Sequence, residues 1–157
     1  MKQRNKAIPA SYLLLEKGGK ILISRRYNTG YHDGKYHLPA GHVDEGEMPS
    51  EALIREAKEE VGIDILPSDL ELVHISYRPK HDETDNRVDF FFRVRKWNGE
   101  VRNIEPDKCD DLKWVSLDAL PKNTNPVVQD AIKCIRKGIF FKELGIPFLK
   151  ENGLWML

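Results

Sequence analysis

Three glutamates close together, Glu56, Glu59 and Glu60, are the residues of this chain whose spacing most clearly suggests chemistry. On a helix that turns by about 100° per residue, they would project together from an arc of about 100°. Like charges at these spacings repel one another, and the repulsion grows as water is excluded. The group therefore predicts a site for a hard divalent cation such as Mg²⁺, which prefers oxygen ligands. A solvated acidic helix face is the alternative that the spacing leaves open.

A basic side chain, Arg55, lies beside these acids and one helical turn from both Glu51 and Glu59. A single guanidinium cannot neutralise three carboxylates. We therefore expect Arg55 to hold one carboxylate in place through a salt bridge.

The surrounding residues predict the helix that carries these side chains, from Pro49 to about Val61. Proline suits a first helical turn, because it has no N–H to leave unpaired. Gly62 can adopt the left-handed conformation that ends a helix. An apolar stripe at spacings of three and four gives the helix a face to bury, and it consists of Leu53, Ile54, Ala57 and Val61.

The rest of the chain reads as strands before and after this helix. Residues 7–15 and 20–26 predict an antiparallel hairpin around a Gly-Gly turn, and 36–39 a short extended piece after a loop. Alternating or apolar runs predict strands at 70–77, 87–96 and 112–115, pairing that resumes at 101–104, and a helix at 127–137. The tail, 139–157, is apolar enough to dock at a place that the sequence does not give. This order of elements predicts an α/β sandwich on a mixed β-sheet.

Bulk properties set limits on partners. The chain of 157 residues fits one domain, 1–157, and its 25 basic and 25 acidic residues balance. No overall field would recruit nucleic acid or a membrane, so we expect neither partner. Cys109 and Cys134 have no metal-binding spacing, and the first residues lack a long apolar run. We expect a reduced protein in the cytoplasm.

The stretch from Gly41 to Ile63 also carries a longer pattern. Gly41 is followed after five residues by Glu47, and after seven more by Arg55 and the acids described above. This spacing matches every fixed position of the Nudix box, so the chain resembles the Nudix hydrolases. Residues 36–40 and 111–121 resemble segments that flank the box in this family, and the resemblance covers about 7–137.

The resemblance implies an α/β/α sandwich that cleaves nucleoside diphosphates linked to another group. It implies that Glu56, Glu59 and Glu60 hold Mg²⁺ or Mn²⁺ together with the carbonyl of Ala40. Gly41 would shape the loop, which Glu47 and Arg55 would orient. An acid from a later loop often acts as ligand or base, and the candidates are Glu105, Asp107 and Asp110.

Other residues would choose the substrate. Arg25 and Arg26 end a strand, so one is expected to face the phosphates and the other to point away. Aromatic side chains nearby would stack on a base or pack as a lid, and they are Tyr27, Tyr31, His32 and Tyr36. Ala40 and His37 stand where many family members have glycine and tryptophan, which leaves the subfamily open.

The expected substrate is a small nucleotide, and residues 25–34 resemble the branch that cleaves nucleoside triphosphates, including oxidised ones. An ADP-ribose or nucleotide-sugar pyrophosphatase is the alternative, and a non-catalytic nucleotide sensor is less favoured because all three acids are present. The protein would be a monomer or a homodimer. The polar connection at 81–85 would bind a second metal or, as the preferred interpretation, form a mobile hairpin tip, and its polar residues are His81, Asp82, Glu83 and Asp85.

Overall fold

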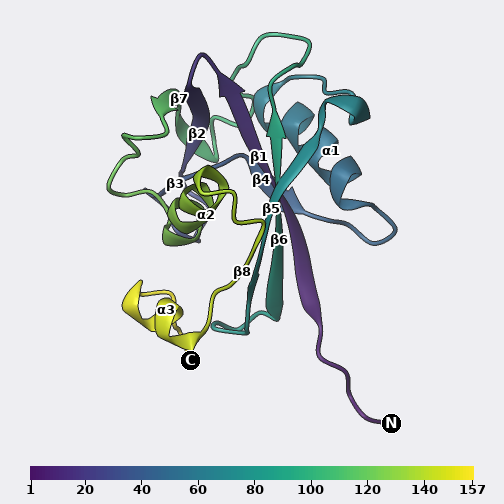
Figure 1. Cartoon of the computed structure of the whole chain (residues 1–157), viewed down its shortest axis with the longest axis vertical. Coiled ribbons are helices and arrows are strands. Elements are labelled where there is room, and N and C mark those ends of the chain that lie inside the picture. Colours follow the sequence, from purple (N-terminus) through teal and green to yellow (C-terminus); the bar gives the residue numbers. More distant parts are fainter.

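The computed structural model describes residues 1–157. Its elements, drawn in Figure 1, are β1 (Ala7–Lys17), β2 (Lys20–Arg26), β3 (Tyr36–His37), β4 (Ala40–His42), α1 (Pro49–Val61), the 3₁₀ helix η1 (Pro67–Asp69), β5 (Glu71–Arg78), β6 (Asn86–Val94), β7 (Cys109–Ser116), α2 (Pro126–Arg136), β8 (Phe141–Glu143) and α3 (Ile146–Glu151). None of the helices is long and apolar enough to cross a membrane.

Strand β1 is the centre of the sheet, whose order is β3-β2-β1-β6-β5-β8, with β4 paired to β1 and β7 to β2. The predicted hairpin is present, and Gly18 and Gly19 have the positive φ angles, 58° and 75°, that a two-residue hairpin turn requires. The two strands pair only next to this turn, at Glu16 with Ile21 and Lys17 with Lys20. Further along, β1 instead pairs with β4 in antiparallel fashion and with β6 in parallel fashion, so the sheet is mixed.

Helices cover both faces of β1 because its side chains alternate (Figure 1). On one face, Leu13 and Leu15 pack in a buried cluster with the α1 residues Leu53, Ala57 and Val61. On the other face, Leu14 packs with Phe91 and with the α2 residues Val128, Ala131 and Ile132. Each fully buried leucine or isoleucine in these clusters contributes about 1.5–3 kcal/mol. The predicted α/β/α sandwich is confirmed.

Helix α1 has the predicted bounds, and Gly62 ends it with a φ of 74°. The expected strand pairing at 101–104 is wrong. The amides of Arg102 and Ile104 instead donate to the carbonyl oxygens of Val61 and Glu60, at 3.0 and 3.1 Å. The last carbonyls of a helix have no partner inside it, and this segment supplies one from outside. The next residue along the chain, Glu105, is thereby brought to the end of α1.

The tail docks at the edge of the sheet beyond β5. Strand β8 pairs with β5 in parallel fashion, from Ile75 with Phe141 to Tyr77 with Glu143. Behind it, the buried side chains of the tail pack against the start of α2 in a cluster of Val127, Leu144, Leu149 and Leu154. Helix α2 begins one residue earlier than predicted, where the side chain of Asn125 accepts the amide of Val127 and caps the helix.

The tail also changes the interpretation of the connection at 81–85. His81 is buried, its Nδ1 lies 2.9 Å from the carbonyl oxygen of Pro79, and its own carbonyl accepts the amide of Met156. The solvated hairpin tip that we predicted is therefore wrong for His81, because the end of the chain covers it. Glu83 and Asp85 are exposed.

Candidate active site

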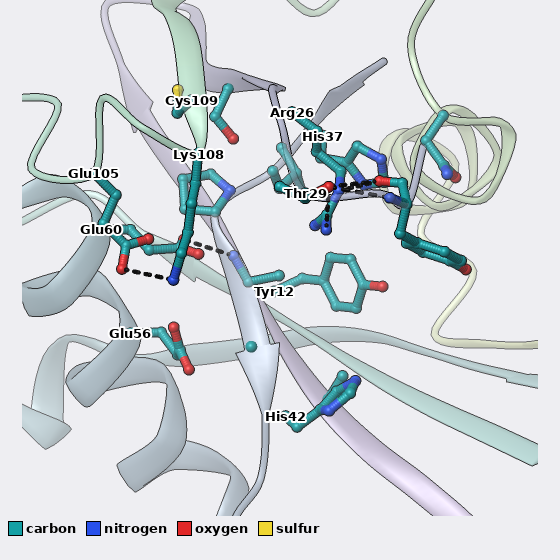
Figure 2. Close-up of a pocket in the computed structure, with 18 of the residues that line it drawn as sticks. Tyr12, Arg26, Thr29, His37, His42, Glu56, Glu60, Glu105, Lys108 and Cys109 are labelled. Atoms are coloured by element: carbon teal, nitrogen blue, oxygen red, sulfur yellow. Dashed lines mark hydrogen bonds and ion pairs between the residues drawn. The ribbon is translucent and has the colours of Figure 1, made fainter. Parts of the chain in front are cut away.

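A cavity of about 560 Å³ lies beside α1 and the central strands, and Figure 2 shows the side chains around it. One part of its wall is acidic. We call this part the acidic end, and it consists of Glu56, Glu59 and Glu60 from α1 together with Glu105 from the segment after β6.

Glu60 is the most enclosed of these acids. Its Oε2 accepts the backbone amide of Ala40 at 3.0 Å (Figure 2). Burial, followed by the nearby charges of Glu56 and Glu105, raises the pKa of Glu60 well above its usual range. A buried carboxylate next to two further acids is costly unless a proton or a cation balances it. The structure shows the amide of Ala40 at this site, whereas the expected contact of its carbonyl oxygen with a metal stays a prediction.

Arg55 forms the expected salt bridge, and its main partner is Glu47. Its Nε and Nη2 donate to the two carboxylate oxygens of Glu47 at 2.8 and 2.9 Å. These bonds and the amide of Asp44 lower the pKa of Glu47 to about 2. The Nη1 atom of Arg55 reaches Glu56 at 2.7 Å and Glu59 at 3.4 Å, and its Nη2 also donates to the carbonyl of His42. Arg55 thus joins the loop before α1 to the acidic end.

The other residue one turn away, Glu51, does not bond to Arg55. Its Oε2 accepts the backbone amide of Met48 at 2.8 Å and so closes the first turn of α1.

Gly41 has a steric reason to be glycine. A Cβ at this position would lie 2.0 Å from Oε1 of Glu56, which is far inside van der Waals contact. The missing side chain is therefore the space in which the carboxylate of Glu56 lies.

The chemistry of the acidic end fits a hard divalent cation, because its donors are carboxylate oxygens and its buried acid lacks a positive partner. In this structure, however, there is no group of three or more His, Cys, Asp or Glu side chains close enough together to hold a metal ion. At the acidic end, Glu56 and Glu59 instead form ion pairs with Arg55, and Glu60 accepts a hydrogen bond from the amide of Ala40. The second metal site considered at 81–85 lacks such a group as well.

Of the three acids considered after β6, only Glu105 lines the cavity. Burial raises the pKa values of Glu56 and Glu60, and the charge of Glu105 adds to this effect. Asp110 instead forms an ion pair with Arg25, and Asp107 does not line the cavity. The Nζ atom of Lys108 lies 3.9 Å from Oε1 of Glu105 and points into the acidic end (Figure 2).

The two arginines at the end of β2 both line the cavity, but they have different partners. The guanidinium of Arg25 donates to Asp110 through Nε at 2.7 Å and Nη2 at 3.1 Å. The guanidinium of Arg26 donates to the carbonyl of Tyr31 at 2.6 Å and to Oγ1 of Thr29 at 3.1 Å. The charge of Arg26 also acts on Glu60 and lowers its pKa, against the larger effect of burial. Arg26, which lines the cavity, therefore has no carboxylate bonded to it, whereas Arg25 has Asp110.

Tyr36 is not brought into the cavity. Its ring is 4 % exposed within the cluster under α2, and its hydroxyl donates to Asp111. The expected contact of Tyr36 with substrate does not match this position, because β3 pairs Tyr36 with Arg25 and turns the ring into the core. Tyr31 does line the cavity, where its ring packs edge-on against His32 with centroids 4.0 Å apart.

Several lining residues had no role assigned to them from the sequence, and His37 had been noted only as standing where many family members have tryptophan. His37 lies in the wall, its Nε2 has no partner, and burial lowers its pKa to about 3, so the ring is neutral. The ring of Tyr12 stacks on Phe91 with centroids 4.6 Å apart. The remaining polar residues that lack a motif are Lys108, Asn125, Thr84, Arg78 and Arg87. Arg78 and Arg87 lie next to each other only because β5 pairs with β6.

Comparison with known proteins gives a match to the model described as NUDIX domain, over residues 6–137. The chain is 31% identical over 109 residues to the ADP-ribose pyrophosphatase of Methanocaldococcus jannaschii, an alignment that covers 69% of this chain and 62% of that protein. It is 27% identical over 119 residues to the 8-oxo-dGTP diphosphatase of Escherichia coli K12, covering 74% and 88%. The chain thus spans less than two thirds of the length of the archaeal relative.

Among solved structures, the MutT NUDIX hydrolase from Burkholderia pseudomallei superimposes with a TM-score of 0.74. The two chains are 26% identical, and the match covers 82% of this chain and 98% of that one.

Proposed function

The chain belongs to the family of NUDIX-domain proteins, and on that premise we propose that it is a pyrophosphohydrolase that depends on Mg²⁺ or Mn²⁺. Its substrate would be a nucleoside diphosphate linked to another group. The observation that carries this proposal is the position of Glu60, a buried acid beside Glu56 and Glu105 in the wall of a cavity. Perturbed acids that share a cavity are typical of catalytic sites.

In this proposal Glu56, Glu59 and Glu60 would hold the cation, with the carbonyl of Ala40 as a further ligand. When bound, such a cation would neutralise phosphate oxygens and lower the pKa of a nearby water. Arg55 would then give up its bonds to Glu56 and Glu59 and keep its two hydrogen bonds to Glu47. The loop that contains Gly41 therefore stays in place.

Two residues of the chain would act on the reacting groups, Arg26 on the diphosphate and Glu105 on the attacking water. Arg26 donates to the oxygens of the substrate's diphosphate and holds it next to α1. A water oxygen attacks phosphorus, the bond to the bridging oxygen breaks, and the carboxylate of Glu105 takes the proton of the water. The leaving group departs as a phosphate or a nucleotide. Lys108 lies next to this carboxylate, with its Nζ atom 3.9 Å from Oε1 of Glu105.

We propose a nucleoside triphosphate or an oxidised form of one as substrate. This choice is supported by the relative named 8-oxo-dGTP diphosphatase, because the alignment covers 88% of that protein's length. ADP-ribose is the second candidate, supported by the relative named ADP-ribose pyrophosphatase. A sensor that binds a nucleotide without cleaving it is a weaker candidate, because the acidic end is complete.

The decisive experiment is a screen of nucleotides with Mg²⁺ in which products are identified by mass. Release of pyrophosphate from a triphosphate supports the first candidate, and AMP with ribose phosphate supports the second. Binding without any product from either class would contradict the hydrolase and leave the sensor.

Three further features accompany the proposal. Residues 1–157 form one domain, supported by the packing of Leu149 and Leu154 against Val127. The two thiols, Cys109 and Cys134, are unpaired, which fits the cytoplasm. The partner is a small nucleotide, and the protein acts as a monomer or a homodimer.

A further inference from the structure

Two arginines face each other in the cavity wall at what we call the basic end, which consists of Arg78 from β5 and Arg87 from β6. They are cross-strand partners. Like charges directly opposite each other destabilise a sheet, and these two are also nearly buried, with 6% and 9% of their surface exposed. Both line the cavity. Such a pair needs a reason other than stability.

The two arginines at the basic end differ in their bonds to carboxylates. The Nη2 and Nε atoms of Arg78 lie 3.0 and 3.2 Å from Oδ2 of Asp89, which is fully buried and does not line the cavity. Asp89 Oδ1 has no partner, so this carboxylate bonds to Arg78 and Ser76 only. Asp89 thus bonds directly to Arg78, and its charge also acts on Arg87 without a direct bond.

Arg87 has neutral partners only. Its Nε and Nη2 donate to Oγ1 of Thr84 at 3.3 and 3.0 Å, and its Nη1 lies 3.3 Å from Nε2 of His42. A guanidinium can only donate, so Nε2 of His42 is the acceptor and the ring adds no charge. Arg87 therefore has no direct bond to a carboxylate, because the nearest one, Asp82, is reached only through the hydroxyl of Thr84. An anion in the cavity could bond to this guanidinium directly.

This end is separate from the acidic end. Figure 2 shows Glu60 and Glu105 together on one side of the cavity, with His42, the neighbour of Arg87, lying away from them. A diphosphate that is cleaved at the acidic end takes its place beside α1. An anion at the basic end is then a different group of the same ligand.

We propose that Arg87, with Arg78 beside it, binds a second phosphate that the substrate carries away from the pyrophosphate to be cleaved. The geometry points to a nucleotide that is also phosphorylated on its ribose, at the 2′ or the 3′ position. A phosphate suits this site because the planar guanidinium offers several donors to its oxygens, and the cavity of about 560 Å³ is large enough for a nucleotide. The choice of substrate rests on the proposed function, whereas the anion site itself does not.

Binding of compounds without a cleavable anhydride tests the site directly. By calorimetry, 5′-AMP is compared with adenosine 2′,5′-bisphosphate and adenosine 3′,5′-bisphosphate, and with ADP, whose second phosphate is on the 5′ side. We expect one bisphosphate to bind about ten- to hundredfold more tightly than AMP, as charge-assisted hydrogen bonds to one phosphate would give. ADP should not show this gain.

The variant Arg87→Gln should abolish the advantage of the bisphosphate. Arg95→Gln is the matched control, since Arg95 is exposed and pairs with Glu16 away from the cavity, and it should keep the advantage. Arg87→Lys keeps the charge but not the planar donors, so it should retain a reduced advantage, and it replaces Arg87→Gln if that variant does not fold. Equal binding of AMP and both bisphosphates, an equal gain for ADP, or an unchanged advantage in the Arg87 variants would each overturn the proposal.

Hydrolysis supplies the second arm, with ADP-ribose and its 2′-phosphate as a matched pair compared by kcat/KM. Selective binding of a bisphosphate without any hydrolysis would contradict the proposed function and leave the anion site standing. If the protein hydrolyses ADP-ribose but shows no preference for an added phosphate, either in binding or in kcat/KM, the anion site would be contradicted and the proposed function would stand.

Discussion

The carboxylate of Glu56 occupies the space that a side chain on Gly41 would need, since a Cβ there would lie 2.0 Å from its Oε1. The glycine on β4 and the glutamate on α1 are therefore fixed as a pair. A side chain at residue 41 would require the side chain of Glu56 to shift.

We expect Gly41→Ala to push Glu56 out of position and to lower kcat by about hundredfold, the size of effect that a displacement of about 1 Å can have in an active site. Gly145→Ala is the control, because a Cβ there would meet only ordinary contact at 3.6 Å from Pro147. Steady-state kinetics would measure kcat for each variant, and a circular-dichroism spectrum would check that each variant is folded. Full activity of Gly41→Ala would show that Glu56 has no fixed place in the reaction.

Replacing Glu60 by glutamine removes a proposed cation ligand and also a buried negative charge. Turnover should fall by about hundredfold or more, and the variant without added metal should melt at a higher temperature than the natural chain, because the repulsion from Glu56 and Glu105 is gone. The two effects have opposite signs. Near-normal hydrolysis by Glu60→Gln would disprove the metal assignment.

Acid should weaken the protein through Glu47. The hydrogen bonds from Arg55 lower the pKa of this carboxyl to about 2, so the folded state holds the charged form more firmly than the unfolded chain does. The stabilisation is present above the ordinary carboxyl pKa of about 4.3 and is lost as the pH falls towards 2. Urea unfolding of Glu47→Gln and of the natural chain should differ at pH 6 and converge near pH 2.

The exposed neighbour Glu45 provides the control for this experiment. Glu45→Gln should follow the natural chain at both pH values. A difference between Glu47→Gln and the natural chain that does not change with pH would mean that the ion pair with Arg55 is not its source.

Among the acids after β6, Glu105 should matter for turnover and Asp107 should not. Loss of a general base typically costs about a hundredfold or more, so Glu105→Gln should slow kcat by this amount. Asp107→Asn should leave kcat unchanged, because Asp107 does not line the cavity. If Asp107→Asn proved to be the slow variant, the role of base would pass to that residue.

The tail should be part of the folded domain. Leu149 is fully buried with Val127, Leu144 and Leu154. Leu149→Ala should therefore lower the free energy of unfolding by about 2–5 kcal/mol. Ile146→Ala, at a side chain that is 44% exposed, should have a much smaller effect in the same urea titration. Equal stability of both variants would mean that the tail folds separately.

The features that were predictable from the sequence are those that local chemistry decides. The bounds of α1 follow from a proline that can start a helix, a glycine that can end one and an apolar stripe between them. The salt bridge of Arg55 was expected because its neighbours along the helix are acids. Its main partner, Glu47, lies in the loop before the helix, where spacing within a helix gives no guidance.

The features that were missed depend on pairing between distant segments. Residues 101–104 look extended, yet their amides complete the end of α1. The burial of Tyr36 depends on the pairing of β3 with β2, and the meeting of Arg78 with Arg87 depends on the register of β5 with β6. No local pattern contains such a register, because it is fixed by the core that the strands share.

The parallel pairing of β1 with β6 also governs when the protein can fold. Ala7 lies opposite Asn86, and Leu15 lies opposite Val94, so α1 and its acids belong to a long segment whose ends must meet before the sheet is complete. Contacts between such distant residues make folding slow. During synthesis the edge of β1 that faces β6 stays unpaired until Val94 has left the ribosome, and shorter nascent chains expose the hydrogen-bonding groups of that edge until then.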